Sequence, residues 1–196
     1  MSEAKTALRD QLLTARRRRP LLELGEAARA IAGHLLEWEP VRRAATVAAY
    51  VSVGAEPGTG VLIDRLREQG RRVIVPVLRP DHDLDWAVHD GALEPAGRGL
   101  LEPVGPRLGT DSVATADVVL VPGLAVAADG MRLGRGGGSY DRTLARLPAG
   151  TPTCVLLYDD ELLPGVPHEP HDLRVTAAAT PSGLTLFRGW SRTFEG

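Results

Sequence analysis

The stretch ATVAAYVSVGAEPGTGVLIDRLREQGRRVIVPVL, residues 45–78, decides the fold. Its first part, ATVAAYVSV (45–53), is a short apolar run that is typical of a buried strand. The next part, GTGVLIDRLREQG (58–70), predicts a helix that ends at Gly70, and RRVIVPVL (71–78) predicts another strand. Because a helix connects the two strands, we expect them to pair in parallel, as in a βαβ unit.

A second unit of the same kind lies further along the chain. Residues 117–126 predict a buried strand that opens into a loop, residues 139–147 a helix, and residues 151–158 the closing strand. We therefore predict an α/β fold with an open, mostly parallel sheet flanked by helices in a Rossmann-like three-layer arrangement. Ligands of such sheets bind beyond the carboxyl ends of the strands. At that edge the sequence places residues 53–60, 122–141 and 159–172.

The rest of the chain predicts a single domain over residues 1–196. Apolar positions at helical spacing predict helices at 3–19 and 20–38, and we expect this N-terminal part (1–38) to pack on the α/β core. The remaining predictions are an exposed strand at 83–90, a long loop at 91–110 and late strands at 175–180 and 184–190.

Composition excludes several classes of function. The net charge of −2 and pI near 6.2 argue against a nucleic-acid or membrane partner, and the Arg16–Arg19 run is interpreted as a solvated helix end. The lone Cys154 and the scattered histidines match neither a disulfide framework nor a zinc site. With no signal-peptide pattern and no long apolar run, we predict a cytoplasmic protein that is a monomer or weak homo-oligomer.

One glycine-rich stretch, RLGRGGGSYDRTLARL (132–147), indicates chemistry. Glycines before a helix allow a ligand to approach the backbone closely, which suits an anion, although the stretch fits neither the Walker motif nor the dinucleotide motif. From the residues alone, an anion site and a plain helix entry are both open. Lys5 is the only lysine in the chain and lies four residues before Arg9, on the same helical face. From the residues alone, it is either a chance survivor in a solvated N-terminal turn, which is favoured a priori, or a position that needs an ammonium group.

These segments together resemble a known family. VPGLAVAADGMRLGRGGGSYDR (121–142) resembles the signature of the 5-formyltetrahydrofolate cyclo-ligases, and AKTALRDQL (4–12), EPGT (56–59) and VPHEPHDLRV (166–175) match further blocks in the same order. The resemblance implies a ligase that uses ATP and Mg²⁺ to convert 5-formyltetrahydrofolate, possibly polyglutamylated, into 5,10-methenyltetrahydrofolate, ADP and phosphate. The implied reaction passes through a phosphorylated formyl oxygen and needs no nucleophile from the protein.

The resemblance also implies roles for individual residues. The group implied to act in catalysis is Lys5, Arg132 and Arg135. The group implied to bind ATP is Lys5, Arg9, Arg132, Gly134, Arg135, Gly136, Gly137, Gly138, Ser139 and Tyr140. Asp141 and Asp172 are implied Mg²⁺ ligands, and Glu56 is implied to hold the pterin ring. Val53, Leu84 and Trp86 are candidates for the folate slot, although any hydrophobic core supplies similar residues.

Four positions depart from the family pattern. Gly58 and Thr176 each stand where other members have an acidic residue. Ala127 replaces the family's aspartate, and Ser139 replaces its first tyrosine. These departures keep two alternatives open, a non-catalytic nucleotide- or folate-binding protein and an ATP-dependent enzyme with another substrate. A nucleic-acid-binding module that uses Arg16–Arg19 is the weakest alternative.

Overall fold

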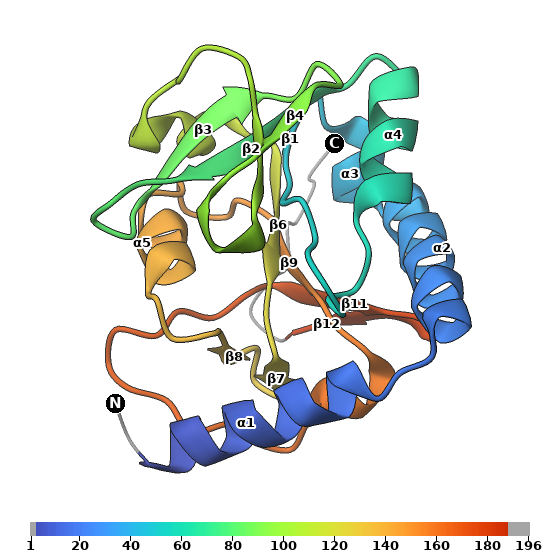
Figure 1. The fold of residues 1–196 in the computed structure, drawn as a ribbon, viewed down its shortest axis with the longest axis vertical. Coiled ribbons are helices and arrows are strands. Elements are labelled where there is room, and N and C mark those ends of the chain that lie inside the picture. The colour runs from blue at the N-terminus through green and yellow to red at the C-terminus, as the bar shows by residue number, and fades with distance from the viewer. Residues whose placement is uncertain (1–2, 188–196) are drawn as a thin grey trace, which may run out of the picture.

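A computed structural model of the chain describes residues 3–187. Its centre is a seven-stranded sheet with the order β12-β11-β9-β6-β1-β2-β3 (Figure 1). The strands are β1 (Thr46–Ala48), β2 (Arg72–Leu78), β3 (Leu84–Val88), β6 (Val118–Pro122), β9 (Thr153–Leu156), β11 (Ala177–Thr180) and β12 (Gly183–Leu186). All neighbours pair in parallel except the two edge strands, β3 and β12, which are antiparallel to β2 and β11.

The strand order creates a switch point between β1 and β6. From β1 the chain passes through a helix to β2 on one side, whereas from β6 it passes through another helix to β9 on the other side. The two connections therefore diverge, and a crevice opens where the carboxyl ends of β1 and β6 lie next to each other.

Helices cover both faces of this sheet, which confirms the predicted three-layer α/β fold. One face packs against α2 (Leu21–Glu37), α3 (Glu39–Arg43) and α4 (Gly60–Glu68). The other face packs against α5 (Ser139–Ala145) and a 3-10 helix (Thr110–Thr115). Alternate residues of each strand enter opposite cores: Val47 and Ala49 face α2, whereas Ala48 faces the other way.

The first helix, α1 (Glu3–Arg17), does not pack on the large sheet as predicted for the N-terminal part. It lies across a small three-stranded sheet, β10-β7-β8, at the bottom of Figure 1. The strands of that sheet are β7 (Ala125–Ala127), β8 (Arg132–Leu133) and β10 (Leu162–Leu163). Leu12 of α1 joins a separate hydrophobic cluster with Leu124 and Leu133. Of the two N-terminal helices, therefore, only α2 packs on the large sheet.

Several sequence predictions are wrong in detail. The strand expected at 45–53 ends at Ala48, because the following residues leave the sheet to build a loop. The segment 91–110 is not a plain loop; it contains a hairpin of β4 (Leu93–Pro95) and β5 (Leu101–Pro103). The strand at 83–90 is largely buried rather than exposed, since the 3-10 helix Thr110–Thr115 and α5 pack against β3. The last predicted strand, 184–190, extends in part outside the described residues.

Candidate functional site

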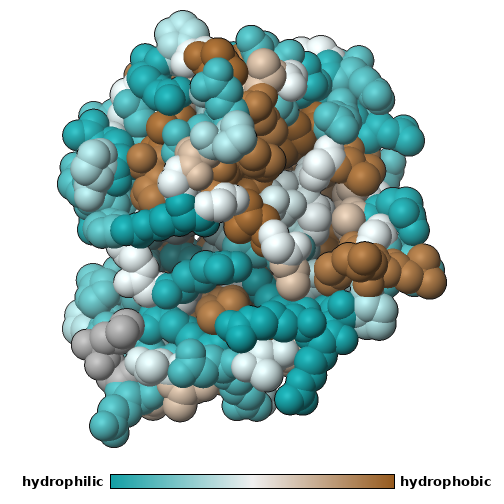
Figure 2. All heavy atoms as spheres, in the orientation of Figure 1, coloured by the Kyte–Doolittle hydropathy of each residue, from teal (hydrophilic) through white to brown (hydrophobic). Residues whose placement is uncertain are grey.

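A pocket of about 500 Å³ lies at the switch point of the sheet. It receives residues from the loop after β1, the end of β6, β8 with the glycine-rich turn, and the segment 169–172. The hairpin β4–β5 and the ends of β2 and β3 line its other side. Figure 2 shows this face of the molecule hollowed between a part where hydrophobic residues gather and a hydrophilic part above α1.

The glycine-rich turn between β8 and α5 forms one wall of the pocket. Gly136 and Gly138 have φ angles of 105° and 71°, which side chains other than glycine rarely adopt. A Cβ atom at Gly134 would lie 2.7 Å from Nη1 of Arg132, so a larger residue there would displace the end of that side chain. The turn can thus bring backbone against a ligand. The following helix has seven residues, so the site depends on the turn and its cations more than on the helix.

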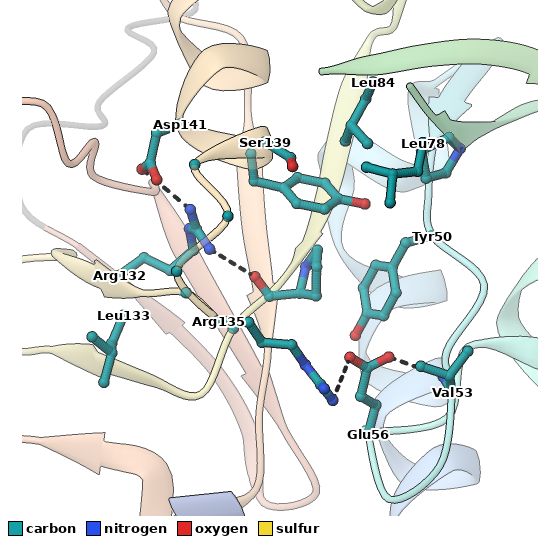
Figure 3. A pocket seen from close by; sticks show the side chains of 18 of the residues that line it. Tyr50, Val53, Glu56, Leu78, Leu84, Arg132, Leu133, Arg135, Ser139 and Asp141 are labelled. Atoms are coloured by element: carbon teal, nitrogen blue, oxygen red, sulfur yellow. Dashed lines mark hydrogen bonds and ion pairs between the residues drawn. The ribbon is translucent and has the colours of Figure 1, made fainter. Parts of the chain in front are cut away.

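Arg132 joins this turn to the centre of the sheet. Its side chain is 3% exposed, and it donates from Nη1 to the Pro122 carbonyl (3.1 Å) and from Nη2 to Oδ1 of Asp141 (3.2 Å). The same carboxylate oxygen accepts the backbone N–H of Leu173 at 3.2 Å. Asp141, drawn with Arg132 in Figure 3, therefore connects the end of β6, the start of α5 and the segment 169–173. The two predicted Mg²⁺ ligands, Asp141 and Asp172, both line the pocket.

Lys5 enters the site from α1. Its Nζ atom donates to Asp172 (2.5 Å) and Glu169 (2.9 Å), and its side chain is 3% exposed. Burial alone would lower the pKa of Lys5, but the hydrogen bonds to the two carboxylates outweigh it and raise the pKa above the ordinary value. Burial likewise acts to raise the pKa of Asp172, and the hydrogen bond from Lys5 reverses the shift. The ammonium and the carboxylates thus hold one another in their charged forms.

Two more arginines fix α1 in place. Arg9 donates from Nε to the carbonyl of Gly134 (2.8 Å), which ties the helix directly to the glycine-rich turn. Arg16 forms a buried bidentate ion pair with Glu161, at 2.7 and 2.8 Å, and donates to the carbonyl of Gly123 (2.7 Å). The orientation of α1, and hence the position of Lys5, depends on these contacts.

The opposite wall presents Glu56 on a rigid loop after β1. Ser52 and Thr59 exchange side chain-to-backbone hydrogen bonds of 3.0 Å, and Thr59 also donates to the carbonyl of Tyr50. The carboxylate of Glu56, which is 8% exposed as a residue, accepts the N–H of Val53 (2.9 Å). Its other oxygen pairs with Arg135 at 2.9 Å (Figure 3). Arg135, which was predicted to bind ATP, therefore reaches across the pocket to Glu56, which was predicted to bind the pterin ring.

The residues predicted to line the apolar part of the pocket were only partly right. Val53 and Leu84 line it, as expected, but Trp86 does not; its side chain extends from β3 into the hydrophobic core and is fully buried. Sequence reasoning missed Tyr50, Glu169 and the hairpin residues. Tyr50 was hidden inside the predicted strand 45–53 and only follows the shorter observed strand β1, and nothing in the sequence signals that residues 100–102 fold back over the pocket.

The comparisons with known proteins agree with this geometry. Residues 1–181 match the family model described as the 5-formyltetrahydrofolate cyclo-ligase family. The chain belongs to this family. The 5-formyltetrahydrofolate cyclo-ligase of Mycolicibacterium smegmatis is 44% identical over 94% of this chain and 98% of its own. The Escherichia coli K12 enzyme of the same name is 34% identical, over 82% of this chain and 89% of its own. The chain is therefore a ligase, as predicted from the resemblance.

Solved structures support the fold. The NMR structure of 5,10-methenyltetrahydrofolate synthetase from Aquifex aeolicus superposes with a TM-score of 0.80, at 23% identity, over 98% of this chain and 96% of its own. The corresponding protein from Mycoplasma pneumoniae gives a TM-score of 0.74, at 21% identity, over 90% of this chain and 98% of its own. Within residues 3–187, no helix is long and apolar enough to cross a membrane.

Three of the four departures from the family signature have a local structural explanation. A Cβ atom at Gly58 would lie 2.9 Å from that of Ala28, so the loop packs closely on α2. Ala127 is buried in β7, beside β10. Thr176 exchanges hydrogen bonds of 2.8 and 3.0 Å with Thr153, which joins β9 to the start of β11. None of the three lines the pocket.

Ser139 is the departure that does line the pocket. Gly138 occupies the N-cap position of α5, and Ser139 is the first residue of the helix. Its Oγ atom instead donates to the carbonyl of His82 (2.6 Å), in the turn between β2 and β3. Ser139 therefore ties the glycine-rich turn to the sheet edge.

The carboxylates present fit a magnesium ion that arrives with a nucleotide. Asp141 and Asp172 both line the pocket, and within residues 3–187 each binds its hydrogen-bond partners at under 3.5 Å through a single oxygen. Among the described residues, no group of three or more His, Cys, Asp or Glu side chains is arranged to hold a metal ion. One or two carboxylates completed by phosphate oxygens and water suit Mg²⁺, which rarely occupies an all-protein cage.

Proposed function

We propose that the protein catalyses the ATP- and Mg²⁺-dependent cyclisation of 5-formyltetrahydrofolate to 5,10-methenyltetrahydrofolate. The observation that carries this proposal is one pocket with two unlike walls. Arg132 and the acidic side chains lie on one wall, with Lys5 paired to two of these carboxylates, and Glu56 lies among apolar side chains on the other. A triphosphate fits the first wall and a flat ring with N–H groups fits the second. The names of the relatives supply the identity of the ring.

The chemistry explains why the two walls must face each other. The formyl oxygen is a poor leaving group, so the γ-phosphoryl group of ATP is first transferred to it, and ADP departs. The neighbouring N10 atom then attacks the activated carbon, loses its proton, and the oxygen leaves with the phosphate. Catalysis of such a transfer depends on alignment of the two substrates and on neutralisation of the spreading charge.

Each wall has residues suited to one of these tasks. Lys5 and Arg132 would neutralise charge on the phosphates, aided by Arg9 and the backbone of the glycine-rich turn. Asp141 and Asp172 would hold Mg²⁺, which supplies further charge neutralisation at the transferred group. Glu56 would accept N–H groups of the pterin. Arg135 is half-exposed in its pair with Glu56, so its side chain can move to the phosphates when the ring arrives.

The test is the growth of 5,10-methenyltetrahydrofolate absorbance from purified protein, 5-formyltetrahydrofolate, ATP and Mg²⁺, with each reactant omitted in turn. We expect product only with all three, and a loss of about 10²- to 10³-fold in kcat for Arg132→Ala. Arg65→Ala removes an arginine from the exposed face of α4 and should keep full activity. A folded protein that binds ATP and folate without product would instead indicate a binding protein. The cytoplasmic location and the oligomeric state stay predictions.

A further inference from the structure

The hydroxyl of Tyr50 is a buried polar group that the proposed mechanism does not use. Tyr50 lies two residues after β1 and lines the pocket, although it is only 3% exposed. Its hydroxyl has no hydrogen-bond partner among residues 3–187. Figure 3 shows it directed from the apolar wall toward the carboxylate of Glu56, at the point where Arg135 crosses the pocket.

Such a hydroxyl is costly to the unliganded protein. A buried donor without a partner forfeits the hydrogen bond that it makes to water in the unfolded chain. Burial, together with the nearby Glu56 charge, raises the pKa of Tyr50 well above its ordinary value, so the group stays a neutral donor and acceptor. A phenylalanine would fill the same space without this penalty. The hydroxyl is therefore best explained by a ligand that pairs with it.

We infer that the Tyr50 hydroxyl binds the folate ring beside Glu56 and helps to determine which rings the pocket accepts, an inference that rests on the proposed function. A carboxylate can only accept hydrogen bonds, so Glu56 selects the N–H groups of a ring. A neutral hydroxyl can donate, so Tyr50 selects an adjacent carbonyl oxygen or ring nitrogen. Together they recognise a heteroaromatic edge on which donors and an acceptor alternate.

Arg135 occupies the carboxylate of Glu56 before the ring arrives. Its guanidinium pairs with Glu56 at 2.9 Å while its own side chain remains 51% exposed, so it can swing away at little cost. Departure of Arg135 would free the carboxylate of Glu56, toward which the Tyr50 hydroxyl points, for the ring. The ring then replaces one charged partner of Glu56 with several hydrogen bonds.

The test compares Tyr50→Phe with the wild type in steady-state kinetics and thermal unfolding. We expect the KM for 5-formyltetrahydrofolate to rise about 10-fold, which is the loss of one hydrogen bond. The KM for ATP should stay within about 2-fold, because the hydroxyl lies on the other wall. The Tm should be equal or higher. Tyr158→Phe is the matched contrast: it removes a hydroxyl that donates to Ala55 at 3.1 Å, so its Tm should fall.

The outcomes separate the inference from the proposed function. An unchanged KM for folate in an active Tyr50→Phe protein overturns the inference alone. So does an equal rise in both KM values, or a lower Tm, since either shows that the hydroxyl supports the fold. A wild-type protein that neither binds nor converts 5-formyltetrahydrofolate overturns the proposed function, and the inference with it.

Discussion

The two walls of the pocket are built in opposite ways. The charged wall is assembled from segments far apart in the sequence: α1, the end of β6, the glycine-rich turn and residues 169–173. Ion pairs and hydrogen bonds hold these segments to one another. The wall around Glu56 is held mainly by one short loop, whose hydrogen bonds join residues three to nine positions apart. The charged wall is therefore the one that distant substitutions can disturb.

The largest expected effect is on the support of the charged wall. Arg16→Met leaves Glu161 buried without its partner, and we expect a loss of about 3–5 kcal/mol in the free energy of unfolding. Denaturant titration measures this loss. Arg17→Met, at the exposed neighbouring position, is the control and should be nearly neutral. A small loss for Arg16→Met would mean that α1 is held chiefly by its hydrophobic contacts.

A smaller effect, on activity, is expected when Arg16 still supports α1 but the cation of Lys5 is removed. Lys5→Ala should lower kcat/KM by about 10²- to 10³-fold, mainly through the use of ATP. Initial rates at varied ATP and varied folate measure the two contributions. Thermal unfolding, measured in parallel, shows how much of the loss reflects the carboxylates of Asp172 and Glu169 that are left without Lys5.

The opposite wall is tested by Glu56→Gln, which keeps the shape and removes the charge. The KM for 5-formyltetrahydrofolate should rise about 10- to 100-fold, because hydrogen bonds to a charged group are lost, and the KM for ATP should change much less. Kinetics at saturating concentrations of the second substrate separate the two values. If Lys5→Ala and Glu56→Gln each changed the kinetic constants for ATP and for 5-formyltetrahydrofolate equally, the division of the pocket into two walls would be wrong.

The smallest effect is the pH dependence of the Lys5 cluster. The pKa values of Asp172 and Glu169 are lowered and that of Lys5 is raised by their pairing. The cluster therefore stabilises the fold fully above the ordinary carboxylate pKa values of 3.8 and 4.5 and below the ordinary lysine value of 10.5. The stability gap between wild type and Lys5→Met should narrow as the pH falls toward about 3. A constant gap would show that packing, not charge, distinguishes them.

The contrast between local and distant contacts also explains which parts of the protein could be predicted from the sequence. The βαβ units were predictable because apolar runs and helical spacing are local signals, and the order of the units places their strand ends at one edge. Glu56, Val53 and the glycine-rich turn lie at that edge, as expected. Their neighbours across the pocket were not predictable, since the pair of Arg135 with Glu56 joins residues on different loops.

The errors have physical causes of the same kind. Trp86 was expected in the folate slot because apolar residues at a strand suit a ligand as well as a core, and only packing by other elements decides between them. The position of α1 on the small sheet depends on two-residue strands that have no periodicity to detect. Tyr50 was missed because an unpaired hydroxyl becomes visible only when its surroundings are known.

The lone lysine gives the protein a built-in spectroscopic reporter. Because Lys5 is the only lysine in the chain, protein grown with ¹⁵N-labelled lysine carries a single labelled side-chain ammonium. That ammonium is buried between Asp172 and Glu169, so its protons should exchange slowly enough to be seen by NMR. Its one resonance would report the arrival of a nucleotide at the charged wall without any substitution or added probe.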